Sequence, residues 1–250
     1  MKEGYKFKDK LIILRFHLKT PLHLLNYLLG IKNSRRLYGN VFIKNRYGLF
    51  FCGNNFSSVF GVGSMSEPIV RKELIIKKGV MMDIGANCGM FTIPTAKMLG
   101  KNGRVISIEP DKKNIKLLKK NVGLNNLKNV DVIEKGVFSK KGKMTFYLDD
   151  IGTGGHSLLK SEVKKKEIIS VDTIDNTLSK LKINHVDLIK IDVEGVEIEA
   201  FKGAKKILKK SHPKIIFEAL SEHKREEIYK FLNQYGYKIK KITDCNYVAV

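Results

Sequence analysis

The chain has few cysteines, little proline and no long uncharged hydrophobic run among its 250 residues. Three cysteines, Cys52, Cys88 and Cys245, are odd in number and far apart, which excludes a disulfide framework and a zinc cluster. We therefore expect a reducing, cytoplasmic setting. Because charged residues interrupt the most hydrophobic stretch, 11–30, no run reaches the roughly 18 residues of a membrane-spanning helix. The same charges argue against a signal peptide.

Acidic residues are also scarce, since 25 Asp and Glu stand against 47 Lys and Arg, leaving a net charge of +22. Such an excess attracts anions, nucleic acid or an acidic membrane surface. Only seven of the basic residues are arginines, the residue whose planar fork reads base edges and clamps phosphates. The sequence also contains no aromatic and basic strip of the kind that stacks unpaired bases. We therefore expect that nucleic acid is not a partner.

The first fifty residues carry eleven of the basic side chains and only two acidic ones. Two short amphipathic helices are predicted within 11–30, on either side of Pro21, which would break or kink a continuous helix. These helices either pack on the body of the protein or dock on an anionic membrane surface. The sequence leaves both interpretations open, so peripheral membrane association is an alternative to a purely cytoplasmic location.

An α+β extension is predicted for residues 1–78. After the helices, the pattern indicates two short strands, 41–43 and 49–51, around a tight turn. A loop rich in Gly, Ser and Asn follows over 53–67, and a short helix over 69–76 leads into the main domain. The boundary with the second domain, 79–250, is placed where a regular alternation of strands and helices begins.

Within residues 79–250, apolar strands alternate with helical patterns, which indicates a parallel sheet with crossover helices. The predicted core strands are 80–84, 104–109, 130–133, 186–191, 214–217, 238–242 and 247–250. The predicted helices are 89–99, with Pro94 requiring a late start or a kink, one capped by Asp111, 197–208 and 222–235. A hairpin excursion is expected with arms 143–148 and 167–171. The fold class is therefore α/β, with a doubly wound, mostly parallel seven-stranded sheet.

The turn after the first strand, Asp83–Gly89, carries the strongest chemical signal. Gly85 and Gly89 let the backbone approach a ligand, and free amides at the helix start can receive a carboxylate. Asp83 can hold an ammonium group, so the turn suits the amino-acid part of S-adenosylmethionine. Glu109, twenty residues beyond Gly89 at the end of the second strand, can accept hydrogen bonds from two ribose hydroxyls.

A nicotinamide dinucleotide is the competing ligand for such a turn. Its fingerprint, G-x-G-x-x-G, would need glycines where Asp83 and Cys88 stand. A carboxylate beside a pyrophosphate is repulsive, so the sequence favours S-adenosylmethionine as the cofactor.

Four separated motifs, in order, resemble those of the FkbM-type methyltransferases. They are MDIGANCGMFTI, VISIEPD, ISVDTIDNTL, and VDLIKIDVEGVEIEAFKGA followed by PKIIFEAL. The resemblance covers roughly residues 75–220 and implies the Rossmann-like fold of class I S-adenosylmethionine enzymes, several of which methylate hydroxyls of sugars or polyketides. It also implies cofactor-binding roles for a set of matched positions. These are Asp83, Gly85, Asn87, Gly89 and Glu109, with Asp192 at the mouth of the fourth strand.

Methyl transfer to a hydroxyl needs in-line alignment and benefits from a base that removes the proton. Asp192 is expected to position the acceptor and the methionyl end of the cofactor, and Glu194 to act as the base or to cap the next helix. His156, in the loop GTGGHSL, is an alternative base or an exposed loop residue. Glu197 is expected to be a solvated charge. Carboxylates at 192, 194 and 218 are suitable ligands for a divalent cation, but we expect no metal.

The leading interpretation is an O-methyltransferase for a glycan, a glycolipid or a small metabolite. A nucleic-acid methyltransferase is an alternative, but Asp192–Gly195 replaces the Asn-Pro-Pro-Tyr-like block of base amino-methyltransferases. A non-catalytic cofactor-binding scaffold is a second alternative, and the intact turn and Glu109 count against it.

Overall fold

The computed structural model describes residues 41–53, 58, 61–62, 67–148 and 165–250. The predicted N-terminal helices and His156 lie outside these ranges. None of the helices within them has the length and apolar character that crossing a bilayer requires. The boundary predicted between residues 78 and 79 stays a prediction.

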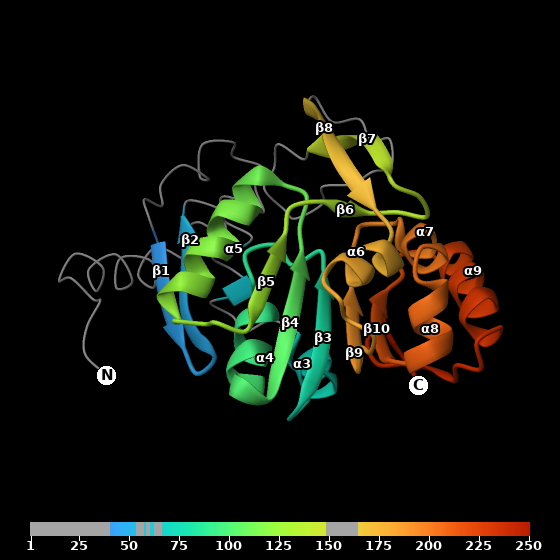
Figure 1. The fold of residues 1–250 in the computed structure, drawn as a ribbon, viewed down its shortest axis with the longest axis horizontal. Coiled ribbons are helices and arrows are strands. Elements are labelled where there is room, and N and C mark those ends of the chain that lie inside the picture. Colours follow the sequence, from blue (N-terminus) through green and yellow to red (C-terminus); the bar gives the residue numbers. More distant parts are fainter. Residues whose placement is uncertain (1–40, 54–57, 59–60, 63–66, 149–164) are drawn as a thin grey trace.

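The core is a seven-stranded sheet, as predicted, with the order β11-β12-β10-β9-β3-β4-β5 (Figure 1). Strands β3, β4, β5, β9 and β10 run parallel, whereas β12 is antiparallel to both β10 and β11. The strands span Gly79–Ile84 (β3), Gly103–Ile108 (β4), Val130–Ile133 (β5), Leu188–Ile191 (β9), Lys214–Glu218 (β10), Ile239–Lys241 (β11) and Asn246–Ala249 (β12). This is the doubly wound, mostly parallel arrangement that the sequence predicts.

Helices cover both faces of this sheet. One face carries α3 (Pro68–Glu73), α4 (Thr92–Leu99) and α5 (Lys112–Leu124), and the other carries α6 (Ile174–Lys180), α7 (Glu197–Lys202), α8 (Lys205–Ser211) and α9 (Glu222–Asn233). The central strands β3, β4, β9 and β10 are mostly buried between these layers, which explains their largely apolar sequences.

Two of the predicted helix starts follow from local chemistry. Asp111 caps α5, because its side chain accepts hydrogen bonds from the backbone amides of Lys113 and Asn114. Pro94 is the third residue of α4, where a helix has no acceptor for a backbone N–H. The late start of α4 at Thr92 therefore accommodates the proline, one of the two outcomes that the sequence allows.

The prediction of a single helix over 197–208 is wrong, because Gly203 and Ala204 separate α7 from α8. A side chain at Gly203 would lie 2.4 Å from the carbonyl oxygen of Phe138. The backbone at Gly203 therefore packs directly against the backbone of Phe138, at a point where a continuous helix was expected. The loop predicted over 53–67 is also wrong in part, because Ser58, Gly61 and Val62 are helical.

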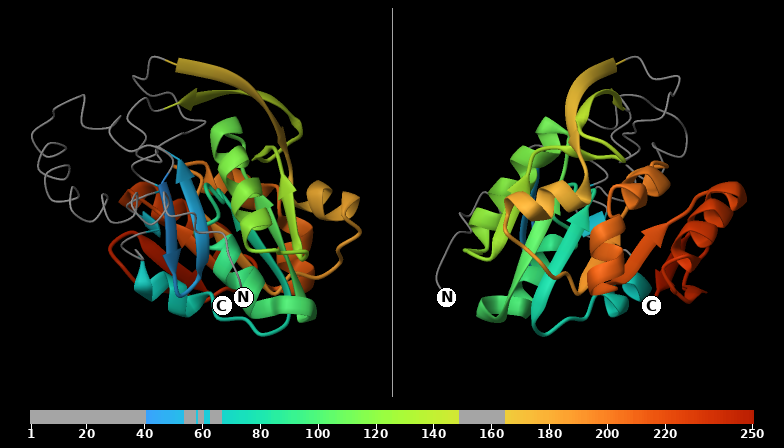
Figure 2. Two further views of the ribbon diagram at one scale, coloured as in Figure 1. Left: turned by 90° about the vertical axis from the view of Figure 1, so that its left-hand side faces the viewer. Right: turned by 45° about the vertical axis from the view of Figure 1, so that its right-hand side comes forward.

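A smaller three-stranded sheet, β6-β8-β7, contains the predicted hairpin excursion. Its strands are β6 (Gly136–Val137), β7 (Gly142–Leu148) and β8 (Lys165–Asp172), with β7 and β8 antiparallel. The arms were predicted, but β6 and the helix α6 that follows β8 were not. Figures 1 and 2 show this sheet beyond the edge of the large sheet at which the parallel strands end.

The predicted strand pair near the N-terminus forms an antiparallel hairpin, β1 (Val41–Asn45) and β2 (Gly48–Gly53). It lies against α5, where two asparagines one helical turn apart bind the backbone of β2. The Asn125 amide exchanges hydrogen bonds with Leu49, at 2.6 and 3.0 Å, and the Asn121 amide does so with Phe51, at 2.6 and 3.2 Å. The two side chains thus act as a neighbouring strand would. Asn121 also donates to the carbonyl of Cys88 at 2.8 Å, which ties the hairpin to the turn after β3.

Replacing Asn121 by alanine is expected to lower the free energy of unfolding by on the order of 2–3 kcal/mol, because buried groups of Phe51 and Cys88 lose their partners. Urea unfolding measures this loss. Lys116→Ala, at an exposed position of the same helix, is the control and should change stability by less than about 0.5 kcal/mol. Equal losses in the two variants would contradict the bridging role of Asn121.

Candidate functional site

The candidate site lies where the direction of strand succession reverses in the large sheet. From β3 the chain continues through β4 to β5 on one side, and it later returns to β9 on the other side of β3. Ligands of doubly wound sheets bind at such a point, outside the carboxyl ends of the strands. The loops that follow β3 and β9 meet here, with the backbone amide of Asp192 donating to the carbonyl of Ile84 at 3.0 Å.

The glycine turn after β3 depends on Gly85. Its φ of +81° lies in the left-handed region, and a Cβ there would lie 1.8 Å from the carbonyl oxygen of Asp192. The amide of Gly85 donates to the carbonyl of Ile108, the last residue of β4, at 2.9 Å. Gly89 and Asn87 also have positive φ values, +91° and +50°. The turn is thus locked between the ends of two neighbouring strands.

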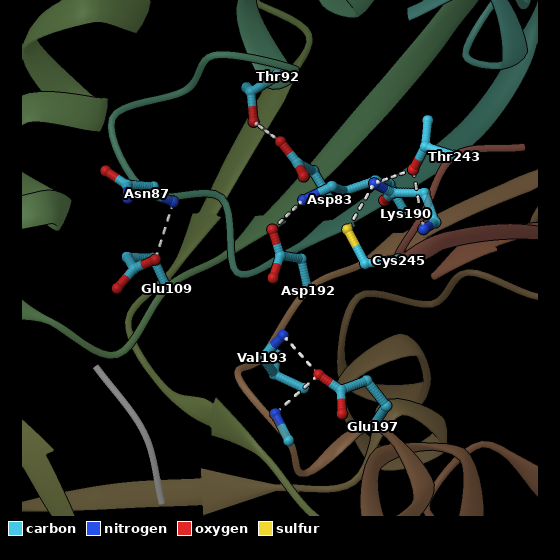
Figure 3. Close-up of polar contacts among 12 residues, drawn as sticks. Asp83, Asn87, Thr92, Glu109, Lys190, Asp192, Val193, Glu197, Thr243 and Cys245 are labelled. Atoms are coloured by element: carbon cyan, nitrogen blue, oxygen red, sulfur yellow. Dashed lines mark hydrogen bonds and ion pairs between the residues drawn. The ribbon is translucent and has the colours of Figure 1, made fainter. Parts of the chain in front are cut away.

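Asp83, at the end of β3, is fully buried (Figure 3). Its Oδ2 accepts a hydrogen bond from the Thr92 hydroxyl at 2.6 Å, and that hydroxyl also pairs with Ser107 at 2.8 Å. Burial raises the pKa of the Asp83 carboxyl, whereas the charge of Lys190 and the hydrogen bond from Thr92 lower it. Thr92 and Ser107 were not among the predicted site residues.

Glu109 lies beside the turn and is 4% exposed. Its Oε2 accepts the amide of Asn87 at 2.8 Å, and its Oε1 accepts the amide of Asp111 at 2.9 Å. Burial raises the pKa of Glu109 to about 7, although both amides lower it. Each carboxylate oxygen has two lone pairs, and Oε1 also accepts the side-chain amide of Asn114 at 3.5 Å. Hydrogen bonding to a ligand therefore remains open at Oε2.

Three buried oxygens around the turn have no hydrogen-bond partner among the described residues. They are Asp83 Oδ1, Asn87 Oδ1 and Asp192 Oδ1. Buried acceptors without donors are costly, and such atoms in one place indicate a bound ligand or water. The expected cofactor carries an ammonium group and ribose hydroxyls, which are donors. The residues present at the turn therefore fit S-adenosylmethionine.

The loop after β9 gathers carboxylates. Glu194 has a φ of +54°, a conformation that non-glycine residues rarely adopt and that often marks functional sites. Burial, followed by the charges of Asp192, Glu218 and Glu197, raises the pKa of Glu194 to about 8. Burial and Asp192 also raise the pKa of Glu218, at the end of β10, to about 7. A carboxylate with a raised pKa is a better base near neutral pH.

Glu197 is not the solvated charge that the sequence suggested. It is 3% exposed, and its Oε1 accepts the amides of Val193 and Gly195 at 3.2 and 2.9 Å (Figure 3). Glu197 therefore fixes the loop that carries Asp192 and Glu194. Its place in the first turn of α7 is the one feature of the sequence that relates to this role.

Lys190 is a further residue that the sequence interpretation missed. It lies in β9, is 3% exposed and donates to Asp192 Oδ2 at 2.9 Å. A lysine inside the apolar run LIKI is the signal that could have identified it, since lysines are rarely buried without a partner.

In the described part of the chain, no group of three or more His, Cys, Asp and Glu side chains is arranged to hold a metal ion. The structure thus brings Asp83, Asn87, Glu109, Asp192 and Glu194 to one edge of the sheet, and the alternative base His156 lies outside the described residues.

Comparison with known proteins shows a match to one family model and similarity to parts of several proteins. Residues 83–239 match the family model described as "Methyltransferase FkbM domain". A probable cobalt-precorrin-6B C(15)-methyltransferase from Sulfurisphaera tokodaii is 32% identical over 112 residues, 40% of this chain and 58% of that protein. Its counterpart from Sulfolobus acidocaldarius is 24% identical over 131 residues, 50% of this chain and 68% of that protein.

Among solved structures, a methyltransferase FkbM from Methylobacillus flagellatus aligns with a TM-score of 0.52 and 16% identity. The alignment covers 95% of this chain and 60% of the other, and at this identity it shows a shared fold alone. The chain thus spans less than two thirds of both this protein and the Sulfurisphaera relative.

Proposed function

The chain belongs to the FkbM methyltransferase family, and on that basis we propose that it transfers a methyl group from S-adenosylmethionine to a hydroxyl group of a glycan, a glycolipid or a small metabolite. The observation that carries the proposal is the set of three buried, unpartnered oxygens, two of them at the glycine turn (Asp83 and Asn87) and one in the loop after β9 (Asp192). Donor binding and proton removal are thereby supported at one edge of one sheet.

Different residues at the turn would bind different groups of the cofactor. Asp83 Oδ1 would hold the ammonium group, and Glu109 Oε2 would accept a ribose hydroxyl. The free amides that the sequence suggested for the carboxylate are not found directly after Gly85, because those of Ala86, Asn87 and Gly89 already donate to acceptors of the protein. When bound, the cofactor supplies an electrophilic methyl group on a positively charged sulfur. Gly85 keeps the turn against the Asp192 backbone, so the donor side and the acceptor side are held in one geometry.

The acceptor side favours an uncharged nucleophile. In a chain of net charge +22, Asp192, Glu194, Glu197 and Glu218 gather at this edge. Carboxylates repel phosphates but form hydrogen bonds with hydroxyls, so a sugar or another alcohol fits better than a nucleic-acid backbone. Glu194 is the proposed base for the acceptor hydroxyl, and Asp192 orients it.

A carbon acceptor is the second candidate. It is favoured by the 32% identity with a protein named as a C(15)-methyltransferase of a cobalt-precorrin. Methylation at carbon would use the same donor turn but would not need a base matched to an alcohol.

The test incubates the purified protein and isotopically labelled S-adenosylmethionine with glycan, lipid, small-metabolite and RNA fractions from cells that lack the protein. We expect label in a glycan, lipid or metabolite hydroxyl, identified by mass spectrometry, and none with Glu194→Gln protein. Label on carbon would select the second candidate, and label in RNA would overturn the proposed acceptor class.

We also propose a cytoplasmic protein that can contact anionic membranes through residues 1–50, where eleven basic and two acidic residues occur. A glycolipid acceptor would use both this segment and the enzyme core. Label confined to the lipid fraction in the experiment above would support this variant.

A further inference from the structure

Lys190 is the buried cation of the site. It lies in the middle of β9, directly opposite Asp83 of β3 in the parallel register, and is 3% exposed. Its Nζ is 2.9 Å from Asp192 Oδ2 and 4.7 Å from the centre of the Phe91 ring. Removing an ammonium group from water costs several kcal/mol, about what close carboxylates and an aromatic face can offset. A lysine at this position therefore adds little to the free energy of folding, which suggests that its charge serves the site.

The groups facing Lys190 come from every neighbouring element. Carboxylates are contributed by β3, by the loop after β9, by the end of β10 and by the start of α3, and a second cation by α3 itself. They are Asp83, Asp192, Glu194, Glu218, Glu67 and Arg71. Among these described groups, carboxylates outnumber cations, so the Lys190 charge compensates mainly Asp192 and Asp83, its two largest electrostatic partners.

We propose that Lys190 is a positioning residue of the methyl-transfer site: its ammonium group lies between the carboxylates of Asp83 and Asp192 and holds them in place to receive the cofactor. The inference rests on the proposed function, because the cofactor ammonium is taken as the ligand of Asp83. The lysine acts through these carboxylates and is not assigned a contact with the reacting atoms. Figure 3 shows the three side chains side by side.

The consequence is a pH-dependent defect when the charge is removed. Burial already raises the pKa of Asp83, and Lys190 is the largest influence that lowers it. Without the lysine, the pKa of Asp83 should rise further. Asp83 would then be protonated at low pH and unable to hold an ammonium group, and it would regain this ability as the pH rises.

The experiment measures the dissociation constant of S-adenosylhomocysteine, a stable probe with the same amino-acid and ribose groups, by calorimetry between pH 6 and 9. The variant-to-wild-type ratio at each pH cancels the titration of the probe itself. For Lys190→Met, we expect binding at least about tenfold weaker near pH 6.5, with the difference shrinking to about twofold by pH 9. Lys190→Arg, which keeps a cation, should give a ratio that does not change with pH.

Two further variants separate positioning from folding. Lys190→Gln keeps a donor for Asp192 without the charge, and it should show the same pH-dependent ratio even if the methionine variant does not fold. Lys214→Met, in the adjacent strand, removes the lysine paired with Glu73 at 2.5 Å and should leave the ratio near one at all pH values. A flat ratio for the Met and Gln variants would overturn the role of Lys190. Absence of binding by the wild-type protein would instead overturn the proposed function.

Discussion

Gly85→Ala protein is expected to lose detectable affinity for S-adenosylmethionine, a decrease of more than about 100-fold. A Cβ at Gly85 would lie 1.8 Å from the carbonyl oxygen of Asp192, which is backbone and cannot rotate away. The two loops must therefore separate, and the groups that receive the cofactor separate with them. Calorimetric titration with S-adenosylhomocysteine measures the loss, and circular dichroism checks that the variant is folded.

The matched control is Gly100→Ala. Gly100 also has a left-handed φ, +51°, but a side chain there would have no neighbour within 4 Å. Gly100→Ala therefore also places a side chain at a positive φ, but without the steric conflict. Binding should be normal in Gly100→Ala. If the folded Gly85→Ala protein bound the probe as tightly as this control, the turn would not be the cofactor site.

Replacing Glu194 by glutamine is expected to lower kcat by about 10²–10⁴-fold while leaving cofactor affinity nearly unchanged. The pKa of Glu194 is raised to about 8, and only its ionised form can accept a proton. The wild-type rate should therefore rise with pH through this value and level off above it. The Gln variant should lose this dependence, because it has no group that titrates at the same position.

Two neighbouring glutamates provide the comparison. Glu218→Gln removes a carboxylate that raises the pKa of Glu194, so the rise in rate should move to lower pH. Glu222→Gln, at an exposed position in the first turn of α9, should change neither rate nor profile. Activity of Glu194→Gln within a few fold of wild type, with an unaltered pH profile, would remove Glu194 from the mechanism.

Much of the fold is encoded in local patterns. The alternation of apolar strands and helical segments predicts the seven-stranded sheet, and a single residue, Asp111, predicts the start of α5. The break between α7 and α8 was not predictable in this way, because it depends on the approach of Gly203 to Phe138, which is distant in sequence. The two-residue strand β6 likewise exists only because β8 pairs with it.

The same distinction, between local patterns and contacts with distant residues, applies to the candidate site. Residues 83–89 are consecutive, and Glu109 stands at a recognisable spacing, so their shared edge could be inferred from strand order. The burial of Glu197 and the inward orientation of Lys190 could not, because each depends on partners supplied by other elements or by the folded loop. Charge and polarity in the sequence say which residues can ionise, but not which are removed from water.

The asparagine pair on α5 also limits how this protein can associate. Exposed strand edges template pairing with other chains, and in β2 that edge is saturated at Leu49 and Phe51 by helix side chains. An incoming strand would have to displace the Asn121 side chain and so break its hydrogen bond to the carbonyl of Cys88. Pairing of another chain with this edge of β2 would therefore also remove a hydrogen bond that holds the turn after β3.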